Sequence, residues 1–285
     1  MGMSVNTNVG AMAALQALNA TSKGLATTQS RINSGMNVSS TKDDSAAYTI
    51  AQNLRGDLGG LKAVTTSLSR AKSVTDVAVA GAEQISDVVN QMKTLAKQAS
   101  DAGVDQTSRD AYNKDFTALR DQITTIVNSS EFSGTNLLKT SGGTVSALQS
   151  LGSISSGGTY TPDTLTVPNQ EMDLAAAGTA GKLNTTSTIS SPSDATTMVG
   201  TLDTLSKAIS TNLSNLGSAS RKIDAQSTFA SKLTDTIESG IGNLVDADLA
   251  KESAKLQALQ VKQQLGVQAL SIANQAPQTI TSLFK

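Results

Sequence analysis

Two pairs of closely spaced carboxylates are the residues of this sequence best suited to chemistry. Asp43 and Asp44 are adjacent, and Asp246 and Asp248 are separated by a single alanine. Paired carboxylates can serve as general acid and base, and they can also bind Ca²⁺. Each pair also precedes a stretch with helical periodicity, where an aspartate caps the first amide groups and offsets the helix dipole. We interpret both pairs as helix starts and assign no catalytic residue.

The amino acids that are absent narrow the chemistry further. The 285 residues include no Cys, no His and no Trp. Without Cys and His there is no disulfide framework, thiol nucleophile, Ser-His-Asp triad or usual zinc site. The formal net charge of −1 argues against binding to nucleic acid. We therefore expect no enzymatic activity, no cofactor and no metal ion.

The sequence shows no pattern typical of a membrane-spanning segment or of a signal peptide. No apolar run approaches the ~20 residues that span a membrane. A cleavable signal peptide begins with a positively charged segment. The first 22 residues of this chain contain no Lys or Arg. We expect neither membrane insertion nor a cleaved signal.

The elements that position these residues begin with a long heptad repeat. Between Ala47 and Ala99, two rows of residues seven apart are apolar at fourteen of sixteen positions. This pattern predicts a coiled-coil-like helix from about 43 to 101, with a start signal at 41–44 and a stop at Gly103. A second helix, at about 107–128, is expected to fold back antiparallel.

The middle of the chain has a different composition. Residues 129–191 are rich in Ser, Thr and Gly. Within them, Tyr160–Val167 is predicted to form β-strand that Pro162 interrupts. A third helix is predicted to begin with Ser191 as N-cap and to break at Gly240 and Gly242.

Both ends of the chain are lightly charged and helical in pattern. Residues 1–42 and 253–285 contain no Asp or Glu. The C-terminal helix has two apolar sides, which a monomer cannot easily bury, so we predict a polymerisation interface. Its predicted residues are Val5, Val9, Met12, Leu15, Leu18, Leu249, Leu256, Leu259, Val267, Leu270 and Ile272.

We thus expect a mainly α fold, a long antiparallel coiled-coil-like helical rod formed by both chain halves, with a small β-containing outer segment. The predicted parts are an N-terminal inner-core helix, N-terminal rod helices, an outer segment, a C-terminal rod helix and a C-terminal inner-core helix. Their ranges are 1–42, 43–140, 141–191, 192–240 and 241–285.

Short motifs at both ends, in this order, resemble bacterial flagellin. They include Arg31-Ile-Asn-Ser-Gly35, Lys42-Asp43-Asp44, Phe132-Ser-Gly-Thr-Asn-Leu-Leu138, Asp246-Ala-Asp248 and Ala273-Asn274-Gln275-Ala-Pro277. The resemblance implies a filament subunit whose termini fold on polymerisation and pack innermost. It further implies export to the flagellum without a cleaved signal, and partners in a filament cap protein, a hook-filament junction protein and an export chaperone.

The resemblance also bears on recognition by the animal innate flagellin receptor. The family has an arginine where Gln91 stands and a glutamate where Asp115 stands, whereas Leu95 is kept. Loss of the guanidinium removes a charge-assisted anchor, so we predict weak receptor activation.

Two other functions share part of this pattern. A hook-filament junction protein has similar termini but builds only a short ring. A flagellin-like surface protein could bind polysaccharide through residues 141–191, where hydroxyl groups and Tyr160 can contact sugars.

Overall fold

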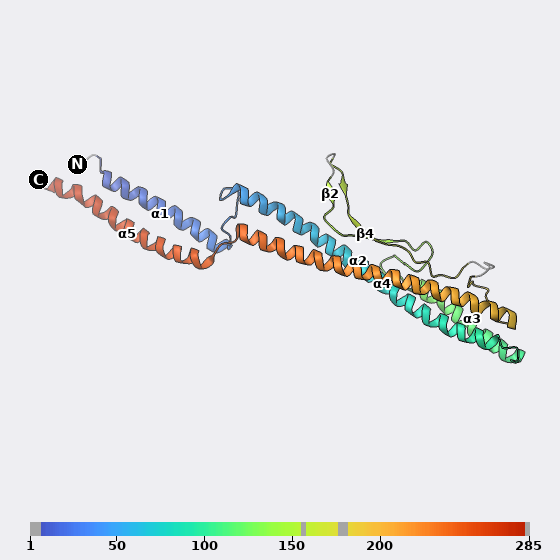
Figure 1. Ribbon diagram of the computed structural model, residues 1–285. Helices are drawn as coiled ribbons and strands as arrows, with labels where there is room; N and C mark the ends of the chain where they lie inside the picture. The colour runs from blue at the N-terminus through green and yellow to red at the C-terminus, as the bar shows by residue number, and fades with distance from the viewer. Residues whose placement is uncertain (1–6, 155–157, 176–181, 283–285) are drawn as a thin grey trace. The chain divides into compact units, whose positions relative to one another are not determined.

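The computed structural model describes residues 7–154, 158–175 and 182–282. Within these ranges the chain forms five helices and four short strands (Figure 1). The helices are α1 (Val9–Ser34), α2 (Ser45–Ala99), α3 (Gln106–Ser129), α4 (Pro192–Val245) and α5 (Leu249–Ser282). The strands are β1 (Val145–Leu148), β2 (Ser153–Ile154), β3 (Tyr160–Thr161) and β4 (Thr164–Val167). The predicted mainly helical fold with a small β-containing segment is confirmed.

Contacts divide the chain into two compact units. The first combines the two ends of the chain, up to Leu58 and from Asp235 onward, and the second comprises Gly59–Thr234. We call them the terminal unit and the central unit. Helices α2 and α4 each contribute a segment to both.

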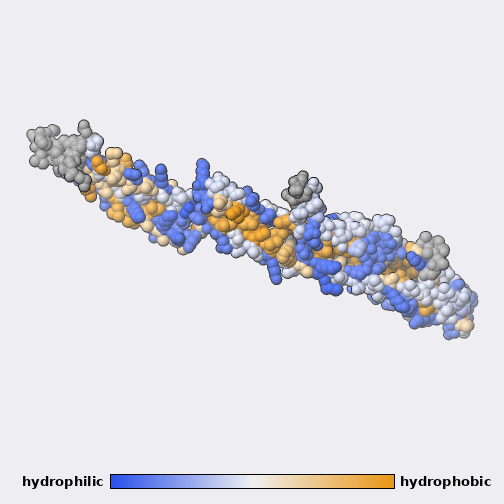
Figure 2. All heavy atoms as spheres, turned by 45° about the horizontal axis from the view of Figure 1, so that its top comes forward, coloured by the Kyte–Doolittle hydropathy of each residue, from blue (hydrophilic) through white to orange (hydrophobic). Residues whose placement is uncertain are grey.

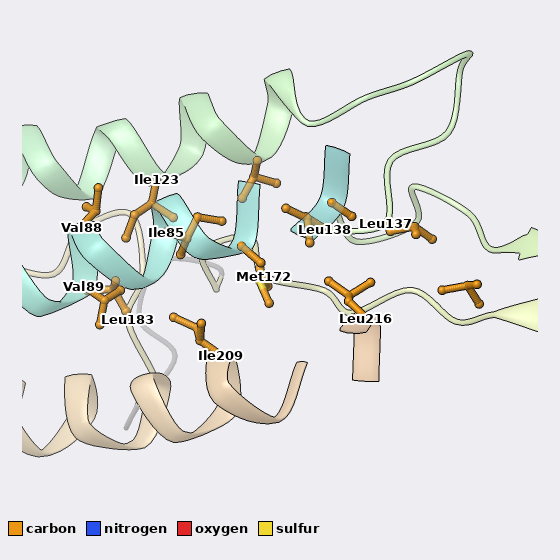
Figure 3. Close-up of a cluster of buried hydrophobic side chains, with 14 of the residues drawn as sticks. Ile85, Val88, Val89, Ile123, Leu137, Leu138, Met172, Leu183, Ile209 and Leu216 are labelled. Carbon is orange, nitrogen blue, oxygen red and sulfur yellow. The ribbon is translucent and has the colours of Figure 1, made fainter. Parts of the chain in front are cut away.

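The heptad rows of α2 form the core of the central unit. From Leu61 to Ala99, all twelve row positions are buried. Figure 3 shows Ile85 of α2 beneath Ile123 of α3, and Ile209 of α4 facing α2 from the other side. The three helices of this unit therefore bury one another, as a heptad pattern on adjacent helices requires.

The turn between α2 and α3 is held by a buried arginine. Helix α2 ends at Ala99, four residues before the predicted stop at Gly103. The Arg109 guanidinium donates to the carbonyl oxygens of Ala99, Asp101 and Val104. These bonds satisfy carbonyl groups that a helix C-terminus leaves without partners.

The strands form two antiparallel pairs. Val145 of β1 lies opposite Val167 of β4, and Ile154 of β2 lies opposite Tyr160 of β3. Val145, Ala147 and Val167 are buried, so one face of the first pair packs onto the central unit's core. Pro162 separates β3 from β4, as its missing amide donor predicts.

Helix α4 begins as predicted but ends later. The Ser191 hydroxyl accepts from the Asp194 amide at 3.1 Å, and Pro192 is the first helical residue. The predicted break at Gly240 is wrong, because α4 continues to Val245. Ile241 and Val245 are buried there with Val38 and Ala51. This burial outweighs the roughly 1 kcal/mol by which a helical glycine is disfavoured relative to alanine.

Candidate polymerisation interface

The terminal unit brings the two chain ends together as an antiparallel helix pair. Helices α1 and α5 run side by side, with the N- and C-termini at the same end (Figure 1). The Asn8 side chain caps α1 and donates to the Ala273 carbonyl of α5 at 2.7 Å. At the opposite end of the pair, Arg31 of α1 donates to Glu252 of α5 at 3.4 Å.

Glycines let the two helices approach closely. A Cβ atom on Gly24 would lie 3.5 Å from a methyl carbon of Leu259. A Cβ atom on Gly266 would lie 3.3 Å from a methyl carbon of Leu18. Each leucine therefore fills the notch that a glycine leaves on the opposite helix.

Backbone hydrogen bonds join the two connections that lead into the pair. The Ala247 amide donates to the Gly35 carbonyl at 2.9 Å. The amides of Asn37 and Val38 both donate to the Val245 carbonyl, at 2.7 and 3.2 Å. Gly35 ends α1 with a φ of 70°, a left-handed conformation that glycine adopts without strain.

The paired carboxylates lie at these connections and act mainly as helix starts. Asp44 accepts from the amides of Ala46 and Ala47, and Asp248 accepts from those of Ala250 and Lys251. The cap of α2 is thus Asp44 rather than a reciprocal box beginning at residue 41.

The two remaining carboxylates of these pairs belong to the connections themselves. Asp43 accepts from the hydroxyl and amide groups of Ser39 and Ser40, and these bonds lower the pKa of its carboxyl group. Asp246 is exposed and pairs through its backbone with Met36.

The predicted interface residues separate into two sets. The first is half-buried between α1 and α5 and consists of Leu18, Leu256, Leu259 and Leu270. The second is exposed and consists of Val9, Met12, Leu15, Leu249, Val267 and Ile272. Val9 is 75% exposed and Ile272 is 69% exposed, and a whole row of such exposed side chains is more typical of an interaction surface than of a free monomer surface. Figure 2 shows apolar surface on this unit next to the grey terminal residues.

The remaining predicted residues lie near the ends of the chain. Asn274 and Gln275 are exposed on α5. Val5 and the side chain of Pro277 lie outside the described residues.

The polar centre of this helix pair is not predicted from the sequence. Glu252 is 7% exposed and Thr28 is fully buried. Burial alone would raise the pKa of Glu252, but the Thr28 hydroxyl, Lys255 and Arg31 together outweigh it, so the pKa lies below the usual value of 4.5. The sequence feature that could have indicated this contact is that Glu252 is the single acidic residue of α5.

The three positions compared with the stretch that the innate flagellin receptor recognises lie in the central unit. Gln91, Leu95 and Asp115 line one shallow groove of about 590 Å³ between α2 and α3. The structure therefore brings these three positions onto one surface. Their side chains include no guanidinium group.

Comparison with known proteins decides the family. Residues 5–142 match the bacterial flagellin N-terminal helical region, and residues 199–284 match the bacterial flagellin C-terminal helical region. The chain belongs to the flagellin family. Flagellins are structural proteins, and no described helix of this one has a stretch of the length and hydrophobicity that would span a bilayer.

Two full-length relatives support the same assignment, and one solved structure is similar over part of the chain. Flagellin FljK of Caulobacter vibrioides is 44% identical over 99% of this chain and 98% of its own length. A flagellin of Brucella melitensis is 35% identical over 99% of both chains. A crystal structure of Bacillus cereus flagellin matches with a TM-score of 0.46 and 22% identity, over 57% of this chain and 88% of its own.

Proposed function

We propose that this flagellin is a structural subunit that polymerises into the bacterial flagellar filament and so serves swimming motility. The observation that carries the mechanism is the exposure of apolar side chains along both α1 and α5. These helices contact each other on one side only, and the outward rows remain in water. Packing of neighbouring subunits against these rows would supply the missing burial.

The energetics favour ordering of the chain ends on assembly. Fixing a residue in one conformation costs about 1–2 kcal/mol, and burying apolar surface returns about 25 cal/mol per Å². A two-helix layer buries little apolar surface, because most large side chains of α1 and α5 are exposed or half-buried. We infer that these helices become stable when copies of the chain surround them.

A single charge on the outward face tests this mechanism. Leu265→Asp places a carboxylate on an exposed apolar position of α5, and Gln264→Asp places the same charge on the adjacent exposed polar position. We expect seeded growth, followed by negative-stain microscopy, to fail for Leu265→Asp and to proceed for Gln264→Asp. Filaments of normal length from Leu265→Asp would refute the role of the outward row.

The family match extends the proposal to location and partners. We propose that the chain is exported without a cleaved signal and resides outside the cell in the filament. Its proposed partners are further copies of itself, other flagellins, the filament cap protein, the hook-filament junction protein and an export chaperone. Cross-linking in growing cells, followed by mass spectrometry, would identify them.

The two alternative functions are not needed to account for these observations. The full-length relatives named above are flagellins, and both terminal helical regions of the family match. We propose that the chain has no enzymatic activity, since the carboxylate pairs are engaged with backbone and serine groups. Filament growth of the purified chain would favour the filament subunit over a protein that forms only a short junction ring.

A further inference from the structure

Helix α5 carries two heptad rows that are almost equally suited to pack against α1. The first row faces α1 and consists of Leu256, Leu259, Gln263, Gly266, Leu270 and Ala273. The second row is exposed and consists of Ala254, Ala258, Val261, Leu265, Gln268 and Ile272. Each row has the alternating spacing of three and four that suits a paired helix, and each includes one glutamine. Apolar content therefore does not determine which row is buried.

The rows lie on nearly opposite sides of the helix. Corresponding positions, such as Leu259 and Val261, are two residues apart, which is about 200° around an α-helix. Exchanging the rows requires a rotation of α5 about its axis, which would also break the hydrogen bond from the Asn8 side chain to the Ala273 carbonyl. The backbone bonds between the connections would resist sliding of α5 but do not distinguish its faces.

One charged contact does distinguish the two faces. Glu252 extends the inward row by one turn and meets Arg31 of α1. Lys255 also contacts Glu252, at 3.7 Å, but it lies on α5 itself and turns with it. Arg31 is thus the cation whose position relative to Glu252 depends on the orientation of α5. The other cation of α1, Lys23, is exposed and lies eight residues away, about 12 Å along the axis.

We propose that the Arg31–Glu252 ion pair selects the face of α5 that packs against α1, and thereby determines which apolar row is offered to neighbouring subunits. Buried ionic and polar groups often contribute little net stability, but a single one can fix how helices pair. Rotating α5 by 200° would carry Glu252 away from Arg31. The inward glycine notch at Gly266 would then also lose Leu18. This proposal rests on the proposed function, because the selected outward row is the one used in assembly.

Relocating the acid tests the proposal without changing composition or charge. The variant Glu252→Ala/Ala254→Glu moves the carboxylate from the inward row to the outward row. The chain contains no cysteine, so introduced pairs report orientation without background. A Cβ atom at Gly266 would lie 3.9 Å from the Cβ of Leu18, within the range of about 3.5–4.5 Å that a disulfide needs. Leu18→Cys/Gly266→Cys therefore reports the observed face, and Leu18→Cys/Gln268→Cys reports the rotated face.

The readout is the disulfide yield of each cysteine pair in full-length chains, measured in seeded filaments and in the chains left unassembled. With Glu252 in place we expect the 18–266 disulfide to dominate. With the acid at position 254 we expect the 18–268 disulfide to dominate, together with a loss of filament yield. The charge swap Arg31→Glu/Glu252→Arg is the control for folding, and we expect it to retain the 18–266 disulfide.

Three results would overturn the proposal. They are a dominant 18–266 disulfide after relocation, a dominant 18–268 disulfide in the charge swap, and disulfides that join two chains rather than one. Failure of the proposed function is distinguishable from these, because the chain with its natural sequence would then form no filaments at all.

Discussion

The central and terminal units carry similar apolar repeats but use them differently. In the central unit, every heptad position of α2 from Leu61 to Ala99 is buried, and the apolar ones from Val64 onward share a core with α3, α4 and the strands. In the terminal unit, Val9, Met12 and Ile272 stay exposed although they belong to equally regular rows. The first unit completes its core within one chain, whereas the second leaves apolar surface exposed. Periodicity therefore predicts a helix and its faces, but the number of available neighbours decides which faces are buried.

The largest effect is expected from a charge inside the helix pair. Leu259→Asp places a carboxylate against the Gly24 notch, where burial without a partner is strongly unfavourable. We expect the critical concentration for seeded growth to rise by at least about a hundredfold, because a lost or uncompensated buried charge commonly costs 3 kcal/mol or more. Unfolding of the central unit should be unchanged. Long filaments from this variant would contradict the distinction between the units.

A cavity in the central unit should, in contrast, act mainly on the stability of the monomer. Leu68 is fully buried, so Leu68→Ala is expected to lower the free energy of unfolding of the monomer by about 3 kcal/mol. Thermal unfolding followed by circular dichroism measures this, with the exposed neighbour variant Ser69→Ala as control. Equal melting temperatures for the two variants would show that the central unit is not the stable core of the monomer.

A smaller effect is expected on the outer groove of the central unit. Gln91→Arg restores a guanidinium beside Leu95 and Asp115 on a surface held by packed helices. We expect the response of receptor reporter cells to rise about tenfold over that of the natural chain, as for one charge-assisted contact at an interface. Gln98→Arg, at the far end of the same groove, is the matched control. An unmodified chain as potent as an enteric flagellin would refute the predicted weak activation.

The smallest effect is the dependence on pH that Glu252 gives to the terminal unit. The pKa of Glu252 is lowered in the folded pair, so its contribution is present above the unfolded value of about 4.5 and is lost as the pH falls through the folded pKa. We expect the critical concentration to rise on acidification below that value. In Glu252→Gln this component should disappear. An identical pH profile for both chains would assign the dependence to other carboxylates.

The sequence predicts the helices well because heptad spacing and capping residues are local signals. Ser191 and Pro192 locate the start of α4, and the rows of α2 locate the central core. The break expected at Gly240 fails because local propensity is overridden by burial of Ile241 and Val245 against Val38. The break occurs instead at Asp246–Asp248, where an aspartate caps the next helix.

The polar centre of the terminal unit was beyond local reasoning. Arg31 and Glu252 are 221 residues apart, and no periodicity links them. Likewise, Leu259 and Leu265 are the same residue in similar heptad rows, but only the first faces α1. Which of two similar rows is inward depends on a contact made after the chain ends have met.

The connection between the helix pair and the rest of the terminal unit has a consequence for sequence divergence. The hydrogen bonds that join its two strands of chain come from the backbone amides of Asn37, Val38 and Ala247. Most substitutions at positions 37 and 247 would leave those bonds intact, so side-chain identity there is free to drift between related filaments. Proline is the exception, because it has no amide hydrogen to donate. At these two positions the junction is thus encoded less by which residues are present than by the one residue that is kept out.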